Sequence, residues 1–81
     1  MSTALTEQKI EQVVRDSLQT FGAEPDQITP EATFEALDID SLDLAELSQI
    51  VQEEFGVELK GSDVADIKTV GEAVALIASR S

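Results

Sequence analysis

The chain has 81 residues and a formal net charge of -12, since 17 acidic residues outnumber 5 basic ones, and it contains neither histidine nor cysteine. This composition excludes a Ser-His-Asp triad, a cysteine nucleophile, an ordinary zinc site and a disulfide. A chain of this length forms one small domain, and we expect residues 1–81 to be a single unit and not a self-sufficient hydrolase.

Acidic side chains are concentrated in the middle of the chain. The segment 16–59 holds 12 acidic residues and no basic one. Such a surface repels nucleic acid and anionic membranes and attracts basic protein surfaces, although acidity can also serve solubility alone. Residues 1–11 show neither the pattern of a signal peptide nor that of a membrane span. We therefore expect a cytoplasmic monomer that binds no nucleic acid and does not insert into membranes.

The first helix is predicted over residues 6–21. Thr6 is placed to cap its first turn, and Leu5 is placed to pack against Ile10 as a hydrophobic staple. Gly22 marks its end. The apolar residues at helical spacing are expected in the core, as scaffold, and are Ile10, Val13, Val14, Leu18 and Phe21.

A long loop is expected over residues 22–40, because this segment contains Pro25 and Pro30 and has no strong helical period. A short helical turn could begin at Pro30. Loops of this length are uncommon in compact domains and need anchors. The candidate anchors are Ile28, Phe34 and Leu37. We expect them to pin the loop and restrain the approach to Ser41.

The second helix is predicted over residues 41–55. Asp40 is placed as its N-cap and Asp43 as its third residue, so that both carboxylates can accept first-turn N–H groups. Ser41 then occupies the first helical position. The apolar spacing predicts a core stripe of Leu44, Leu47, Ile50, Val51 and Phe55. The outward residues are Ser41, Leu42, Ala45, Glu46, Gln49, Gln52 and Glu53.

A short third helix is predicted over residues 62–67, after Gly56 ends the second. Ser62 is its expected cap, and Val64 and Ile67 are expected to face inward. Val57 and Leu59, in the connection, are further candidates for burial.

The fourth helix is predicted over residues 70–79. Thr69 and Glu72 form a T-x-x-E capping box at its start, and residues 79–81 are expected to fray. Its apolar face contains Val70, Ala73, Val74 and Ile77. No segment of the sequence alternates with the period of a strand. The sequence therefore predicts an all-α fold, a small four-helix bundle with three longer helices and one short helix.

The start of the second helix resembles a known motif. The run Asp40-Ser41-Leu42-Asp43, followed by Glu46-Leu47 and by Glu53-Glu54-Phe55, resembles the modification-site helix of acyl carrier proteins, and the similarity covers nearly the whole chain. The resemblance implies that Ser41 carries a covalent 4'-phosphopantetheine. It also implies that a separate phosphopantetheinyl transferase attaches this group from coenzyme A with the help of magnesium, and that the chain is a free-standing, non-catalytic carrier.

Partner binding is a second implication of the resemblance. In the family, basic surfaces of synthases and transferases meet the acidic outward face of this helix around an apolar contact. Carried over by position, the partner-binding residues are Asp40, Leu42, Asp43, Glu46, Gln49 and Glu53. Leu42 has no core role in the helical pattern, which suits a contact with a partner. A gap between the second and third helices could also shelter an acyl chain, with Leu47, Val51, Val64 and Ile67 as lining residues.

Some positions depart from the common family pattern and leave the pathway open. Asp38 stands where a glycine is frequent, Ser48 and Gln49 stand where apolar residues are frequent, and Lys60 stands where a proline is frequent. We expect a carrier of acyl thioesters in fatty-acid or polyketide biosynthesis. A peptidyl or D-alanyl carrier and an unmodified acidic interaction module are the alternatives. A calcium-binding EF-hand is excluded, because the spacing of the acidic residues fails its template, and no metal site is predicted.

Overall fold

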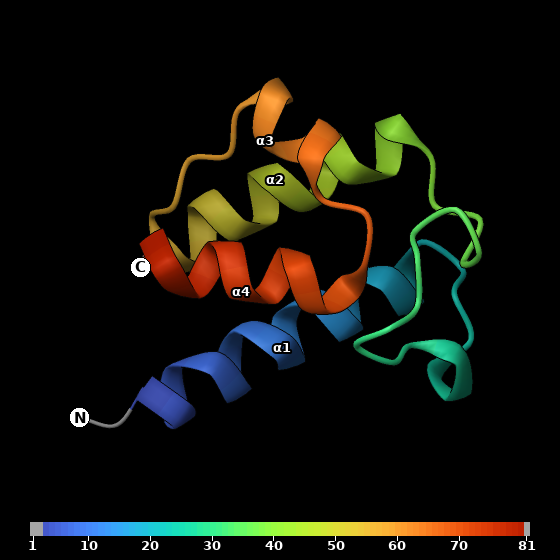
Figure 1. Cartoon of the computed structure of the whole chain (residues 1–81), viewed down its shortest axis with the longest axis horizontal. Helices are drawn as coiled ribbons and strands as arrows, with labels where there is room; N and C mark the ends of the chain where they lie inside the picture. Colours follow the sequence, from blue (N-terminus) through green and yellow to red (C-terminus); the bar gives the residue numbers. More distant parts are fainter. Residues whose placement is uncertain (1–2, 81) are drawn as a thin grey trace.

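The computed structural model describes the backbone of residues 3–80 and the side chains of residues 7–80. This part of the chain contains four α-helices, one short 3-10 helix and no strand (Figure 1). The α-helices are α1 (Thr3–Thr20), α2 (Ser41–Phe55), α3 (Gly61–Asp66) and α4 (Val70–Arg80), and the 3-10 helix is η1 (Pro25–Gln27). The prediction of an all-α bundle with three longer helices and one short helix is confirmed.

The core lies between the three longer helices. α1 packs against both α4 and α2, and Figure 1 shows α3 at the edge of the molecule beyond α2 and α4. The buried apolar residues of the longer helices are Ile10, Val14 and Leu18 in α1, Leu47 and Val51 in α2, and Val70, Ala73, Val74 and Ile77 in α4. α3 has no buried residue. These buried residues all belong to the predicted apolar stripes. Val13, which was also predicted in the core, is only half-buried. The predicted core residues Phe21, Leu44 and Phe55 are likewise partly buried and pack against the core.

Three helix ends differ from the sequence prediction. α1 begins at Thr3, because Ala4 and Leu5 are good helix formers that extend it by one turn. Thr6 therefore lies inside the helix and does not cap it, and the predicted contact of Leu5 with Ile10 lies outside the side chains that the structure describes.

The start of α3 and the end of α4 are the other two differences. α3 begins at Gly61 with Lys60 as its N-cap residue. The carboxylate of Asp63 accepts the N–H of Lys60 at 3.0 Å, so the first turn is capped without Ser62. α4 continues to Arg80, where fraying was predicted, because Arg80 is bound to Asp63.

The loop between α1 and α2 is anchored by the predicted residues. Ile28, Phe34 and Leu37 are all buried. Ala23 and Ile39 are buried as well and were not predicted. Arg15 of α1 adds a polar anchor, since its guanidinium donates to the Ile28 carbonyl at 2.8 Å. Pro25 begins η1, and Pro30 lies in a turn that does not become a helix.

The same loop is also fastened to the start of α4 by backbone hydrogen bonds. The N–H groups of Val70 and Gly71 donate to the carbonyls of Ala32 (3.0 Å) and Pro30 (2.9 Å). In the opposite direction, the Phe34 N–H donates to the Lys68 carbonyl at 3.1 Å. These bonds satisfy first-turn donors that a helix leaves unpaired. They also fix the path of the chain from Pro30 toward α2.

Candidate functional site

The start of α2 is held by two carboxylates. Asp40 has an extended backbone, and its side chain accepts the Asp43 N–H at 3.0 Å. The Asp43 carboxylate accepts the Asp40 N–H at 3.5 Å, a long and therefore weak bond. The predicted capping by this pair is present, and the negative charge of both side chains suits the positive end of the helix dipole.

Ser41 is the first residue of α2 and is exposed. Because Asp40 and Asp43 make the capping bonds, the Ser41 hydroxyl is not needed to cap the helix. Its backbone is fixed while its side chain is accessible to a second protein. The chain contains no histidine that could act as a base toward this hydroxyl, so activation of the oxygen has to come from another enzyme.

The approach to Ser41 is a tight turn with buried residues on both sides. Leu37 and Ile39 point into the core with exposed fractions of 7% and 6%. Asp38 between them has a positive φ of 62°. The Ile39 N–H donates to the Phe34 carbonyl at 2.9 Å, and the Asp38 N–H to the Glu35 carbonyl at 3.1 Å. The turn therefore fixes Asp40 and Ser41 relative to the core.

A hollow of about 350 Å³ lies directly beside Ser41, between α2 and the segment that leads into α3. Its lining residues are Ser41, Ala45, Ser48, Leu59, Gly61 and Val64. The predicted lining was therefore only partly right: Val64 lines the hollow, whereas Leu47 and Val51 are buried in the core and Ile67 packs against the core. The hollow borders Ala45 and Ser48, a less apolar face of α2 than the predicted one. Leu47 and Val51 do not line it because they are buried in the core.

Ser48 gives this hollow a polar side. Its side chain is half-buried, and its hydroxyl donates to the Leu44 carbonyl at 3.1 Å. The hydroxyl proton is thus occupied within the helix, while the oxygen keeps acceptor capacity. In the sequence Ser48 stands out only as a departure from a family pattern, and in the structure it lines the hollow together with Leu59 and Val64.

The outward face of α2 is arranged as predicted. Asp43 is half-buried, and the other predicted partner-binding residues are exposed: Asp40, Leu42, Glu46, Gln49 and Glu53. The side chain of Leu42 is 75% exposed. Contact of a large apolar side chain with water is unfavourable, and such exposure suits a site that a partner covers.

Ile50 was predicted in the core, and this prediction is wrong in part. Its side chain is only half-buried and lines a surface depression of about 230 Å³ together with Glu46, Gln49 and Glu53. Leu47 and Val51, on either side of it in the helical pattern, take the central core positions. Ile50 is therefore the apolar residue in the lining of this depression, which Glu46 and Glu53 make acidic.

Neither a membrane-spanning helix nor a metal-binding cluster is found in the described part of the chain. None of the helices within residues 3–80 is long and apolar enough to cross a membrane. Over the same residues, no group of three or more potential ligand side chains lies close enough together to hold a metal ion.

The chain is similar to known proteins over most of its length. A family model described as the phosphopantetheine attachment site matches residues 8–77. An acyl carrier protein of Nitratidesulfovibrio vulgaris is 40% identical over 75 residues, which cover 91% of this chain and 95% of that protein. Meromycolate extension acyl carrier proteins of Mycobacterium bovis and Mycobacterium tuberculosis are 44% identical over 60 residues, which cover 73% of this chain. The chain spans about half (52%) of the length of these mycobacterial relatives.

Proposed function

The chain belongs to the phosphopantetheine attachment family, as an acyl carrier protein, and on this premise we propose that Ser41 is the residue that carries its 4'-phosphopantetheine. Domains of this family hold the group covalently and are carriers without catalytic activity. The observation that supports Ser41 is its position: it is exposed at the first residue of α2, its hydroxyl is not used by the cap, and it borders the hollow between α2 and α3.

The residues around Ser41 fit a covalent phosphodiester. The hydroxyl is accessible, and the start of α2 places backbone N–H groups and the positive end of the helix dipole beside it. When attached, the group supplies the thiol that forms thioesters, which a chain without cysteine lacks. The fixed turn before Asp40 and the capping bonds hold the Ser41 backbone in one place while a transferase acts on its hydroxyl.

Partner docking belongs to the same proposal. The outward face of α2 presents Asp40, Asp43, Glu46 and Glu53 around the apolar side chains of Leu42 and Ile50. A basic partner surface with an apolar contact complements it in charge and in polarity. We assign this face to the phosphopantetheinyl transferase and to acyl synthases and transferases. Exposed ion pairs contribute at most about 1 kcal/mol each, so such docking is weak and reversible.

The acyl cargo is assigned by chemistry and by the relatives. The names of the similar mycobacterial proteins refer to the extension of meromycolate, a lipid. Together with the partly apolar hollow beside Ser41, this supports fatty-acid-type or polyketide-type acyl groups over aminoacyl or peptidyl groups. We propose that the protein carries such groups as thioesters and presents them to its partners as a monomer.

The experiment that tests the assignment is intact-mass measurement after incubation with coenzyme A and a phosphopantetheinyl transferase. The wild-type protein should gain one phosphopantetheine, and Ser41→Ala should gain none. Ser48→Ala is the matched control, because Ser48 borders the same hollow but its hydroxyl is bonded within α2; it should be modified like the wild type. Modification of Ser41→Ala would place the attachment at another residue and refute the assignment. A wild-type protein that stays at its original mass would refute it too and would favour an unmodified interaction module.

A further inference from the structure

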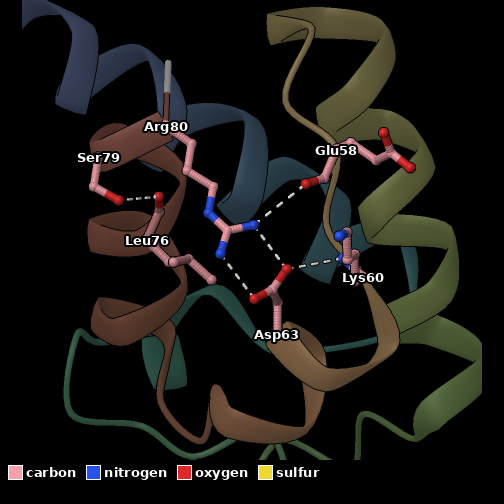
Figure 2. Close-up of polar contacts among 6 residues, drawn as sticks. All are labelled: Glu58, Lys60, Asp63, Leu76, Ser79 and Arg80. Atoms are coloured by element: carbon pink, nitrogen blue, oxygen red, sulfur yellow. Dashed lines mark hydrogen bonds and ion pairs between the residues drawn. The ribbon is translucent and has the colours of Figure 1, made fainter.

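Arg80, in the last turn of α4, binds Asp63 of α3 through two parallel hydrogen bonds (Figure 2). The two guanidinium nitrogens donate to the two carboxylate oxygens at 2.7 and 2.8 Å. Bidentate arginine–carboxylate pairs fix the orientation of both groups as well as their distance. This pair therefore connects α3 to α4 through two residues that are 17 positions apart in the sequence.

The same two side chains also hold the backbone between α2 and α3. The Asp63 carboxylate accepts the N–H of Lys60 at 3.0 Å, and the Arg80 guanidinium donates to the Glu58 carbonyl at 3.4 Å. Figure 2 shows Glu58, Lys60 and Asp63 arranged around the guanidinium. We call Arg80, Asp63 and the backbone of Glu58 and Lys60 the α3–α4 latch.

Apart from this latch, α3 is held by partly buried apolar residues beside it, Leu59 before the helix and Ile67 at its C-cap, which pack against the core. It has six residues, none of them buried, and an isolated helix of this length is not stable in water. Val64 and Ile67 are only half-buried. A polar connection that would be a minor contribution in a well-packed helix is therefore a large part of what fixes this one.

The segment held by the latch forms one wall of the hollow beside Ser41. Leu59 and Gly61 lie within residues 58–63, and Val64 follows immediately; all three line the hollow, whereas Ala45 and Ser48 of α2 form the opposite side. Any movement of α3 away from α4 would carry these three residues with it and widen the space next to Ser41.

We propose that Arg80 and Asp63 are positioning residues that hold the α3 wall of this hollow, and that they thereby set how well it shields an acyl thioester carried through Ser41. This inference rests on the proposed function in its second half, because only an acylated carrier has a thioester to shield. The latch itself is a property of the unmodified chain, so the two halves can be tested separately.

The first test measures amide hydrogen exchange in the unmodified protein, comparing wild type with Arg80→Gln. Loss of the pair should raise exchange in residues 61–67 about fivefold, while exchange in α1 and in the middle of α4 stays unchanged. Lys9→Gln is the matched control, since it changes the net charge equally at an exposed position of α1 and should leave α3 unaffected. Unchanged exchange of α3 in Arg80→Gln would overturn the proposal. A rise spread over all helices would overturn it too, because it would show general destabilisation.

The second test uses the same proteins loaded with an octanoyl-phosphopantetheine group, and measures the rate at which hydroxylamine cleaves the thioester. Arg80→Gln should be cleaved about two- to fivefold faster than wild type and Lys9→Gln. If α3 exchanges faster but the cleavage rates are equal, the residues are structural only and the positioning role is wrong. If none of the three proteins accepts the group at Ser41, the proposed function fails. The exchange result still decides whether the latch exists.

Discussion

At the scale of single residues, the backbone of Asp38 is the least ordinary feature near Ser41. Among the non-glycine residues that the structure describes, Asp38 has a positive φ, of 62°. The left-handed region costs an L-residue roughly 1–2 kcal/mol, and aspartate tolerates it better than most because its short polar side chain can bond locally. A glycine, which is frequent at this position in the resembling family, would adopt the same backbone conformation without this cost, since it has no side chain to clash.

Substitutions of Asp38 should therefore separate by backbone tolerance. We expect Asp38→Ala to be less stable than Asp38→Gly by about 1 kcal/mol, because alanine keeps the steric cost of the left-handed conformation without a polar side chain. Urea unfolding followed by circular dichroism measures the difference. Glu35→Ala and Glu35→Gly, at an exposed position of the same turn, provide the control. Equal stability of the two Asp38 variants would show that the turn carries no strain.

Two residues show where the prediction of burial failed. Ile50 fits the helical pattern of α2 but lies at the border of its apolar stripe, and only the packing of neighbouring helices decides on which side of the border it falls. Ile39 is 6% exposed, yet it stands in a loop without any period. Ile28, Phe34 and Leu37 were predicted as anchors because each is a large apolar residue in a polar segment. Ile39, between Asp38 and Asp40, meets the same criterion, so its burial could have been predicted in the same way.

At the scale of elements, the capping boxes predicted for α2 and α4 are confirmed, whereas the caps predicted at Thr6 for α1 and at Ser62 for α3 are wrong. The capping boxes of α2 and α4 use residues three apart in the sequence, and both form: in α4 the Glu72 N–H donates to the Thr69 hydroxyl at 3.1 Å and the Thr69 N–H to the Glu72 carboxylate at 3.0 Å. α3 was predicted one residue late. Its cap depends on Asp63, whose carboxylate is fixed by Arg80 in another helix, and no local pattern contains that pair.

The latch between α3 and α4 should also be visible as a dependence of stability on pH. The pKa of Asp63 is lowered from 3.8 to about 2. The largest cause is the hydrogen bond from Arg80, followed by the hydrogen bond from the Lys60 N–H. Because the pKa is lower in the folded state, the carboxylate stabilises the fold above about pH 4, and this contribution is lost as the pH falls toward about 2.

The measurement is urea unfolding of wild type and Asp63→Asn over this pH range. The wild type should be the more stable protein above about pH 4, and the difference should shrink steadily toward about pH 2. Carbon-13 NMR titration of the Asp63 carboxyl in Arg80→Gln serves as the control, and its pKa should return toward the ordinary value. A stability difference that does not change with pH would contradict the assignment of the shift to this pair.

At the scale of the whole molecule, charge governs which partners can approach. No basic residue occurs between Asp16 and Leu59. Of the five basic residues, Arg15 and Arg80 donate to the Ile28 carbonyl and to Asp63. The outward face of α2 therefore presents a negative potential with little local compensation. Such a field accelerates encounters with basic surfaces at low ionic strength and weakens when salt screens it.

Reversal of one charge on this face should consequently slow modification. We expect Glu46→Lys to lower the rate at which a phosphopantetheinyl transferase loads the protein by up to about fivefold at low salt, with the difference fading near 1 M salt. Glu24→Lys, an equal charge change at an exposed loop position, should load nearly normally. Circular dichroism should confirm the helical content of both. Normal loading of Glu46→Lys at low salt would place the docking surface elsewhere.

The junction between the long loop and α4 has a consequence for sequence variation far from Ser41. Gly71 lies so close to the loop that a methyl group added to it would stand 2.9 Å from the Pro30 carbonyl oxygen, a backbone atom that cannot rotate away. Even alanine at position 71 would have to displace the backbone at Pro30, in the loop that leads to Ser41. Position 71 is thus closed to side chains for a steric reason, although it lies thirty residues from Ser41 in the sequence.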